Sequence, residues 1–140
     1  MSTSWQFWAL LSAGFAGLTA ILAKVGVQTI DSDLATLLRT IVIVAVLTLF
    51  VLIKNGWETL AEVTPHATVF LVLSGLATGA SWLCYFRALK LGDASRVAPL
   101  DKLSVVFVAL LGASFLGEHL SPTHWFGIGL ITAGAILLAV

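Results

Sequence analysis

Long apolar runs, each close to the length needed to cross a bilayer, occupy almost the whole of this 140-residue chain. A helix of about 20 mainly apolar residues spans the hydrocarbon core of a membrane. By that measure the pattern predicts five transmembrane helices, over residues 5–25, 34–53, 65–89, 96–116 and 122–140. The predicted fold class is therefore all-α integral membrane, with a single domain that extends over residues 1–140.

Polar residues and prolines mark the ends of the predicted helices. Asp31 or Asp33 is expected to cap the second helix. Thr64 and Ser121 each place a hydroxyl directly before a proline, which is typical of the start of a helix. The segments between the predicted helices are short, so no extramembrane domain is expected.

Composition agrees with the membrane class and excludes several functions. Hydrophobic residues make up 59% of the chain and charged residues only 10%, whereas soluble domains carry about 25% charged residues. Seven basic and seven acidic residues balance, which leaves no basic surface for nucleic acid. Cys84 is the one cysteine, and no Cys/His spacing of a metal site occurs. We expect no nucleic-acid partner, no metal, no cofactor and no enzymatic activity.

Basic residues gather on one side of the predicted bundle. Arg87, Lys90 and Arg96 flank the loop between the third and fourth helices, and Lys24 and Arg39 flank the loop between the first two. Both loops lie on the same side of the membrane, and the opposite side carries a single lysine. Basic loops stay in the cytoplasm. This distribution predicts an N-terminus outside and a C-terminus in the cytoplasm.

Ionisable residues inside the predicted spans are the first functional candidates, because a charge within a bilayer is costly. Asp101 and Lys102 lie within the predicted fourth helix, where neighbours point about 100° apart and face different partners. Asp101 has two interpretations, a fixed ion pair with Arg39 or Lys24, or a role in substrate or proton handling. Arg39 is expected to point inward, whereas Lys24 can extend to the headgroups.

A polar and aromatic face is predicted on the third helix. Ser74, Thr78, Ser81 and Tyr85 follow one another at helical spacing, and Trp82 borders them. Such a face suits a cavity for a small amphipathic solute. The alternative is anchoring in an interfacial aromatic belt, which fits Tyr85 better than Trp82.

Small residues predict close helix contacts. Gly127 and Gly134 lie one heptad apart in the fifth helix, and such residues allow helix backbones to approach closely in lipid. This face serves either packing within the bundle or a homodimer. Glu118 and His119, at the end of the fourth helix, are assigned a structural role near Ser121.

Several strings resemble a known family. Ala-Pro-Leu-Asp-Lys-Leu-Ser-Val-Val-Phe (98–107), Phe-Leu-Gly-Glu (115–118) and Gly-Ile-Gly-Leu-Ile-Thr-Ala-Gly-Ala (127–135) resemble the closing helices of an EamA domain, the unit of the drug/metabolite transporter superfamily. Residues 33–40 and 75–89 resemble its five-helix bacterial and archaeal branch. The resemblance implies a transporter of small solutes in the cell membrane. It also implies a homodimer, parallel or antiparallel, because larger relatives contain two such domains.

The leading hypothesis is therefore a solute transporter that works by alternating access. Its site would be lined by Arg39, Trp82, Tyr85 and Asp101, with Asp101 as the protonatable group and Lys102 or Arg39 as its counter-charge. Lys24 is a further candidate for this site. One alternative is a flippase for a lipid-linked substrate, whose phosphate would meet the basic residues. A second alternative is a membrane scaffold that transports nothing.

Overall fold

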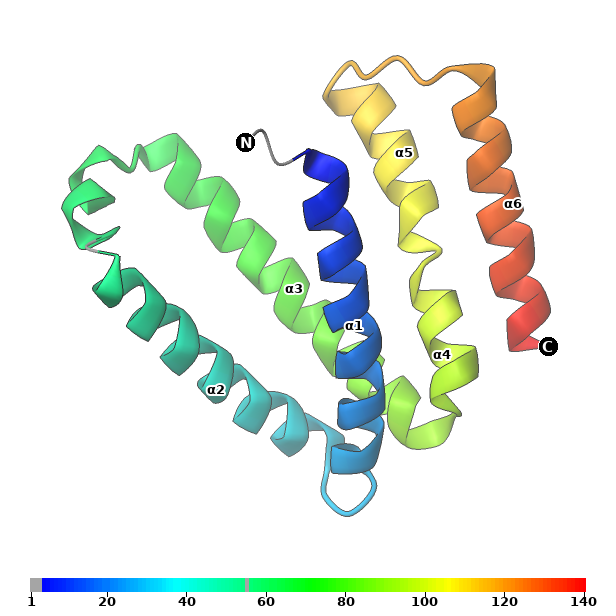
Figure 1. Cartoon of the computed structure of the whole chain (residues 1–140), viewed down its shortest axis with the longest axis horizontal. Coiled ribbons are helices and arrows are strands. Elements are labelled where there is room, and N and C mark those ends of the chain that lie inside the picture. The colour runs from blue at the N-terminus through cyan, green and yellow to red at the C-terminus, as the bar shows by residue number, and fades with distance from the viewer. Residues whose placement is uncertain (1–3, 55) are drawn as a thin grey trace. The chain divides into compact units, whose positions relative to one another are not determined.

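The computed structural model describes residues 4–54 and 56–140, and no β-strand occurs in these ranges. The helices are α1 (Trp5–Val27), α2 (Ser32–Ile53), the 3₁₀-helix η1 (Gly56–Glu62), α3 (Pro65–Leu91), α4 (Ala94–Asp101), α5 (Ser104–Phe115) and α6 (Pro122–Ala139) (Figure 1). Five spans among the described residues are long and apolar enough to cross a membrane, with α4 and α5 counted together as Ala94–Phe115. The all-α membrane class is confirmed.

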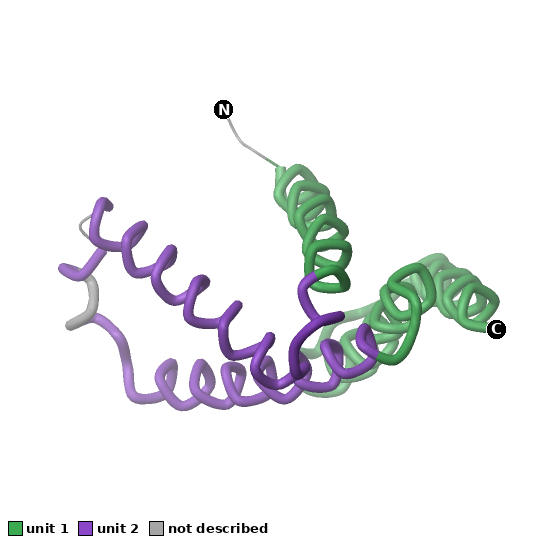
Figure 2. Tube along the Cα trace, turned by 90° about the horizontal axis from the view of Figure 1, so that it is seen from below, with its two compact units in different colours: residues 1–25, 91–140 green, residues 26–90 purple. Residues whose placement is uncertain are grey.

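Backbone contacts divide the chain into two compact units (Figure 2). Unit 1 contains the chain up to Val25 together with Leu91–Val140, and unit 2 contains Gly26–Lys90. In unit 1, α6 packs against α4 and α5. In unit 2, the buried residues gather where α2 begins and α3 ends, and they include Val27, Ala35, Phe86 and Leu89. The single domain over residues 1–140 stays a prediction.

Most large apolar side chains along the helices are exposed, among them Leu47, Phe70, Leu76 and Leu130. In a soluble protein, contiguous apolar surface of this extent would drive aggregation. In a bilayer the same side chains contact lipid, while helices satisfy their own backbone hydrogen bonds. The exposed apolar surface therefore agrees with the membrane class.

Three predicted helix caps are present. The Asp31 carboxylate accepts hydrogen bonds from the backbone N–H groups of Asp33 (2.9 Å) and Leu34 (3.3 Å). The Thr64 hydroxyl accepts one from the Ala67 N–H group at 3.2 Å. The Ser121 hydroxyl accepts one from the His124 N–H group, the first half of a capping box that starts α6. Side-chain acceptors of this kind satisfy the unpaired donors of a first helical turn.

The fourth span differs from its prediction. The pattern predicted one helix over residues 96–116, whereas the structure contains α4 and α5, separated by Lys102 and Leu103. Four backbone bonds across this break, each of 3.0 Å, run from the N–H groups of residues 102, 103, 105 and 106 to the carbonyl three residues earlier. Pro99 lacks an N–H group and cannot make the bond that a continuous α-helix requires. Just after Pro99, over residues 102–106, the chain tightens into 3₁₀-type turns.

The Asp31 cap generates a prediction about stability. Hydrogen bonds from the N–H groups of Leu34 and Asp33, helped by the charge of Lys90, hold the Asp31 pKa below its ordinary value of 3.8. A carboxyl group with a lowered folded pKa stabilises the fold above its unfolded pKa and loses that contribution as the pH falls through the folded value. Asp31→Ala should therefore lower the melting temperature at pH 7, and the deficit should shrink below about pH 3.8.

Melting curves of the detergent-solubilised protein at pH 7 and pH 3 measure this effect. Asp31→Asn, which keeps an acceptor oxygen, should melt close to the unchanged protein. Asp93→Ala is the matched control, because Asp93 caps α4 without a side-chain hydrogen bond. Equal losses in Asp31→Ala and Asp93→Ala would contradict the assignment of Asp31 as a stabilising cap.

Candidate functional site

The inner face of α2 carries Arg39. Ser32, Ala35 and Thr36 are buried along this face, and Arg39 follows at helical spacing as a half-buried residue. The Thr36 hydroxyl donates to the Ser32 carbonyl at 2.8 Å, and the Thr40 hydroxyl donates to the Thr36 carbonyl at 2.7 Å. These hydroxyls are uncharged and bond to carbonyl groups of their own helix. The charge on this face therefore comes from the Arg39 guanidinium.

The last three turns of α3 supply an aromatic face opposite Arg39. Trp82 and Tyr85 are half-buried, and Phe86 and Leu89 are buried, at spacings of three and four residues. The Arg39 Cζ atom lies 4.2 Å from the centroid of the Trp82 ring and 5.5 Å from that of Phe86. Both distances are within the range of cation–π attraction. Arg39 of α2 is therefore held against α3 by rings.

The guanidinium of Arg39 has no acidic partner in the part of the chain that the structure describes. The ion pair found among those residues joins Lys102 to Asp101. A guanidinium has five N–H donors and stays charged at every physiological pH. Aromatic rings attract its face, and Tyr85 interacts with it electrostatically, but neither supplies a full negative charge. The arrangement suits an anion that arrives with its own oxygen atoms, such as a carboxylate or a phosphate.

The polar stripe predicted on α3 continues from this cluster along the helix. Ser74, Thr78 and Ser81 are exposed, and the Thr78 hydroxyl donates to the Ser74 carbonyl at 2.9 Å. These small hydroxyl side chains leave the stripe polar without adding a charge. The structure thus places Arg39, Trp82 and Tyr85 in one unit, with the hydroxyl stripe extending from them.

Asp101 and Lys102 lie at the break between α4 and α5. The Lys102 Nζ atom is 3.1 Å from a carboxylate oxygen of Asp101. The sequence predicted that these two neighbours face different partners, as they would on a regular helix. In the structure they pair with each other, next to the tightened turn at residues 102–103. The side chains are 61% (Lys102) and 39% (Asp101) exposed, so the pair is accessible.

Two lysines near helix ends donate to backbone carbonyls. The Lys24 Nζ atom donates to the Gly92 carbonyl at 2.8 Å within unit 1, and the Lys90 Nζ atom donates to the Ile30 carbonyl at 2.6 Å within unit 2. Ammonium groups commonly stabilise exposed carbonyls near helix C-termini in this way. Lys24, predicted as a site residue, is therefore seen in a structural contact.

Phe86 is a part of the cluster that the sequence did not single out. It lies one helical turn after Trp82, and this i, i+4 spacing is the signal that could have identified it. Among the described residues no group of three His, Cys, Asp or Glu side chains could hold a metal ion. The arrangement offers a cation set on aromatic rings, and it offers no nucleophile with a base beside it.

Comparison with known proteins identifies relatives that are transporters by name. The sequence profile of the EamA-like transporter family matches residues 3–140. An uncharacterized transporter in the cobO 3′ region of Sinorhizobium sp is 62% identical over 140 residues, which cover 100% of this chain and 99% of that protein. No solved structure matches the chain.

Two other relatives match over part of their length. The first is a probable 4-amino-4-deoxy-L-arabinose-phosphoundecaprenol flippase subunit ArnE of Pseudomonas fluorescens, 30% identical over 87 residues, with 62% of this chain and 65% of that subunit covered. The uncharacterized transporter YwfM of Bacillus subtilis is 33% identical over 64 residues. That match covers 46% of this chain and 22% of YwfM, so YwfM is considerably longer.

Proposed function

Since the chain belongs to the EamA-like transporter family, we propose that it is a secondary transporter of a small metabolite or drug-like solute that carries an anionic group. The family and the names of its relatives indicate a transporter rather than an enzyme. Five predicted spans make it a multi-pass membrane protein. The finer proposal is alternating access, with Arg39 as the group that binds the solute.

The observation that carries the proposal is the Arg39 guanidinium on the rings of Trp82 and Phe86, without a carboxylate partner among the described residues. An unneutralised charge in a membrane span is costly, and such residues commonly mark a substrate pathway. An anionic solute would neutralise Arg39 when it binds. Trp82 and Tyr85 would contact the apolar part of the same solute.

Asp101 is proposed as the protonatable coupling group, with Lys102 as its counter-charge. Two features support this role: the pair is accessible, and it lies where the fourth span is broken. Discontinuous helices in secondary transporters commonly supply coupling-ion and substrate sites. Protonation of Asp101 would break its ion pair with Lys102. The net charge of the two side chains would then change from zero to positive during the transport cycle.

Flipping of a lipid-linked substrate is the second candidate function. It is favoured by the name of the ArnE relative, a flippase subunit for a sugar carried on phosphoundecaprenol. A phosphate is as good a partner for a guanidinium as a carboxylate. The two candidates therefore use the same Arg39 cluster, and they differ in whether the anion is attached to a lipid.

A homodimer and an orientation complete the proposal. A Cβ atom added at Gly127 or Gly134 would meet no described atom within 4 Å apart from its own helix, which leaves room for a second helix to approach. The greater length of YwfM agrees with a working unit larger than this chain. Part of this helix already packs internally, as the buried Ala135 indicates. The N-terminus is proposed to lie outside and the C-terminus in the cytoplasm.

Replacing Arg39 tests the proposed solute site. In proteoliposomes, uptake of amino acids, organic acids, amines and nucleobases is measured beside scrambling of a fluorescent polyprenyl phosphate. Arg39→Gln should reduce transport of the anionic substrate by about tenfold or more, because a hydrogen bond to a charged group contributes roughly 1.5–3 kcal/mol. Arg39→Lys should restore part of the rate, since it keeps the charge but loses the planar donor pair.

Arg87→Gln is the matched control, because Arg87 is an exposed arginine of α3 and should leave transport unchanged. Uptake of a free organic anion supports the solute transporter, and scrambling of the lipid alone supports the flippase. If Arg39→Gln transports as fast as the unchanged protein, the proposed anion site is wrong in both cases.

Replacing Asp101 tests the proposed coupling group. Asp101→Asn removes the titratable carboxyl group while keeping its shape, so uptake driven by a pH gradient should fall to the level of empty liposomes. Exchange of labelled for unlabelled solute without a gradient should persist, since binding depends on Arg39. Asp93→Asn, a change at an exposed aspartate of the same unit, is the control. Undiminished gradient-driven uptake by Asp101→Asn would reject the role of Asp101.

A further inference from the structure

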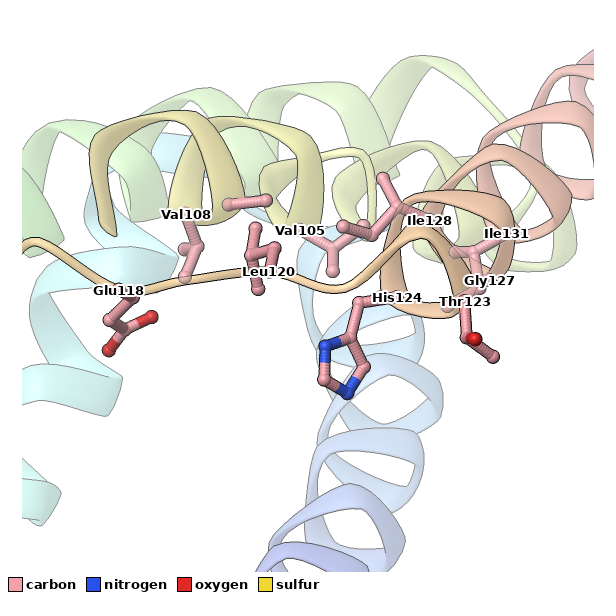
Figure 3. A pocket seen from close by; sticks show the side chains of 10 residues that line it. Val105, Val108, Glu118, Leu120, Thr123, His124, Gly127, Ile128 and Ile131 are labelled. Carbon is pink, nitrogen blue, oxygen red and sulfur yellow. The ribbon is translucent and has the colours of Figure 1, made fainter. Parts of the chain in front are cut away.

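A groove lies between α5 and α6 in unit 1, and the segment that joins these helices forms part of its wall (Figure 3). Its volume is about 410 Å³, and its walls are largely apolar. Val105, Val108 and Ala109 come from α5, and Ile128 and Ile131 come from α6. Ligand sites of drug-like size commonly measure about 300–1,000 Å³ and combine apolar walls with a few polar groups. The groove meets both conditions.

Glu118 is the acidic group of this groove, and local backbone geometry places it there. Gly117 has a φ of 68°, a left-handed conformation that favours glycine, and it turns the chain back after α5. The Glu118 N–H group then donates to the Gly112 carbonyl at 3.1 Å. A Cβ atom added at Gly112 would lie 2.9 Å from the Glu118 Oε2 atom. The absence of a side chain at Gly112 therefore lets the carboxylate lie against α5.

His124 provides a second polar group of the groove, and its ring takes part in the cap of α6. Its Nδ1 atom accepts a hydrogen bond from the Ser121 N–H group at 3.3 Å, as part of the capping box of α6. The ion pair that the structure shows joins Lys102 to Asp101 and does not involve Glu118. The Glu118 carboxylate thus has no cationic partner in the part of the chain that the structure describes.

We propose that this groove is a binding site for a small apolar amine, whose ammonium group pairs with Glu118 and whose apolar body lies between α5 and α6. The charge of the groove decides the choice of ligand, because an ammonium group complements the exposed Glu118 carboxylate and a neutral group does not. Glu118 lies in the segment between α5 and α6, and this position sets how the amine would be oriented. It keeps the ammonium group at the polar end of the groove, near the membrane surface, while the body enters the apolar part.

This site is separate from the proposed solute site in its residues and in the sign of its charge. Arg39 belongs to unit 2, whereas every residue that lines the groove belongs to unit 1. The proposal therefore does not depend on the function proposed for Arg39, and either can fail alone.

Calorimetric titration of the full chain in phosphatidylcholine nanodiscs tests the site. The probe is 4-phenylbutylamine, and its neutral counterpart is 4-phenylbutan-1-ol. The amine should bind saturably and about tenfold or more tightly than the alcohol, as expected for a charge-assisted hydrogen bond. Glu118→Gln should reduce amine affinity to that of the alcohol and leave binding of the alcohol unchanged.

Gly112→Ala provides a second variant that keeps every charge. Its methyl group would displace the carboxylate end of a flexible side chain rather than any backbone atom, so the fold should persist while amine affinity falls. Glu58→Gln, a change at an exposed glutamate in η1, should bind the amine as the unchanged protein does. Arg39→Gln should also bind the amine normally, which separates this test from that of the solute site.

Three results would overturn the proposal. Glu118→Gln could bind the amine as tightly as the unchanged protein, or the alcohol could bind as tightly as the amine. The unchanged protein could also show no saturable binding, as expected if a lipid chain or a second copy fills the groove. Loss of amine affinity in both Glu118→Gln and Gly112→Ala, with Glu58→Gln unaffected, would support it.

Discussion

The stacking of one guanidinium on aromatic rings is the interaction on which the functional account depends. Arg39 reaches from α2 to Trp82 and Phe86 of α3, and no carboxylate neutralises it among the described residues. Within a bilayer, a charge is stable only when other groups or water compensate it. Rings and the nearby Tyr85 compensate the guanidinium in part but bring no negative charge. The cluster therefore combines a fixed position with a charge that the proposed anionic solute would neutralise.

The sequence was sufficient to predict the five spans because their signal is strong. Apolar runs of spanning length separated by short polar breaks admit few other interpretations, and the caps at Asp31, Thr64 and Ser121 follow from local hydrogen bonding. The break after Asp101 was not predicted, although the sequence contains Pro99 two residues before it. A proline in the first turns of a helix is often tolerated, and its effect depends on which neighbouring bonds tighten.

Side-chain partners were harder to predict than helices. The inward position of Arg39 and the aromatic face at Trp82 and Tyr85 were expected, but their direct contact depends on how α2 and α3 pack. Phe86 was overlooked for the same reason. Glu118 was assigned a structural role near Ser121. The position of its carboxylate against Gly112 could not be predicted, because it depends on the left-handed conformation of Gly117, which hydropathy does not reveal.

Glycine has two different uses in this chain. No described side chain lies within reach of Gly134 on α6, and Gly127 lines the groove between α6 and α5. Gly112 instead makes room for a charged side chain of its own chain, so it shapes a polar end on an otherwise apolar groove. A pattern of small residues alone does not distinguish packing between helices from the accommodation of a polar group. The structure distinguishes them through what lies within reach of each missing side chain.

A double-mutant cycle tests the central interaction most directly. The free energy of unfolding in detergent is measured for the unchanged protein, Arg39→Leu, Trp82→Leu and the double variant. The account predicts a coupling energy of about 0.5–2 kcal/mol between Arg39 and Trp82. A parallel cycle on Lys54 and Phe50, whose exposed contact measures 4.8 Å, should give a smaller value. Additive effects of Arg39→Leu and Trp82→Leu would contradict the account, since Arg39 would then not be held on the ring.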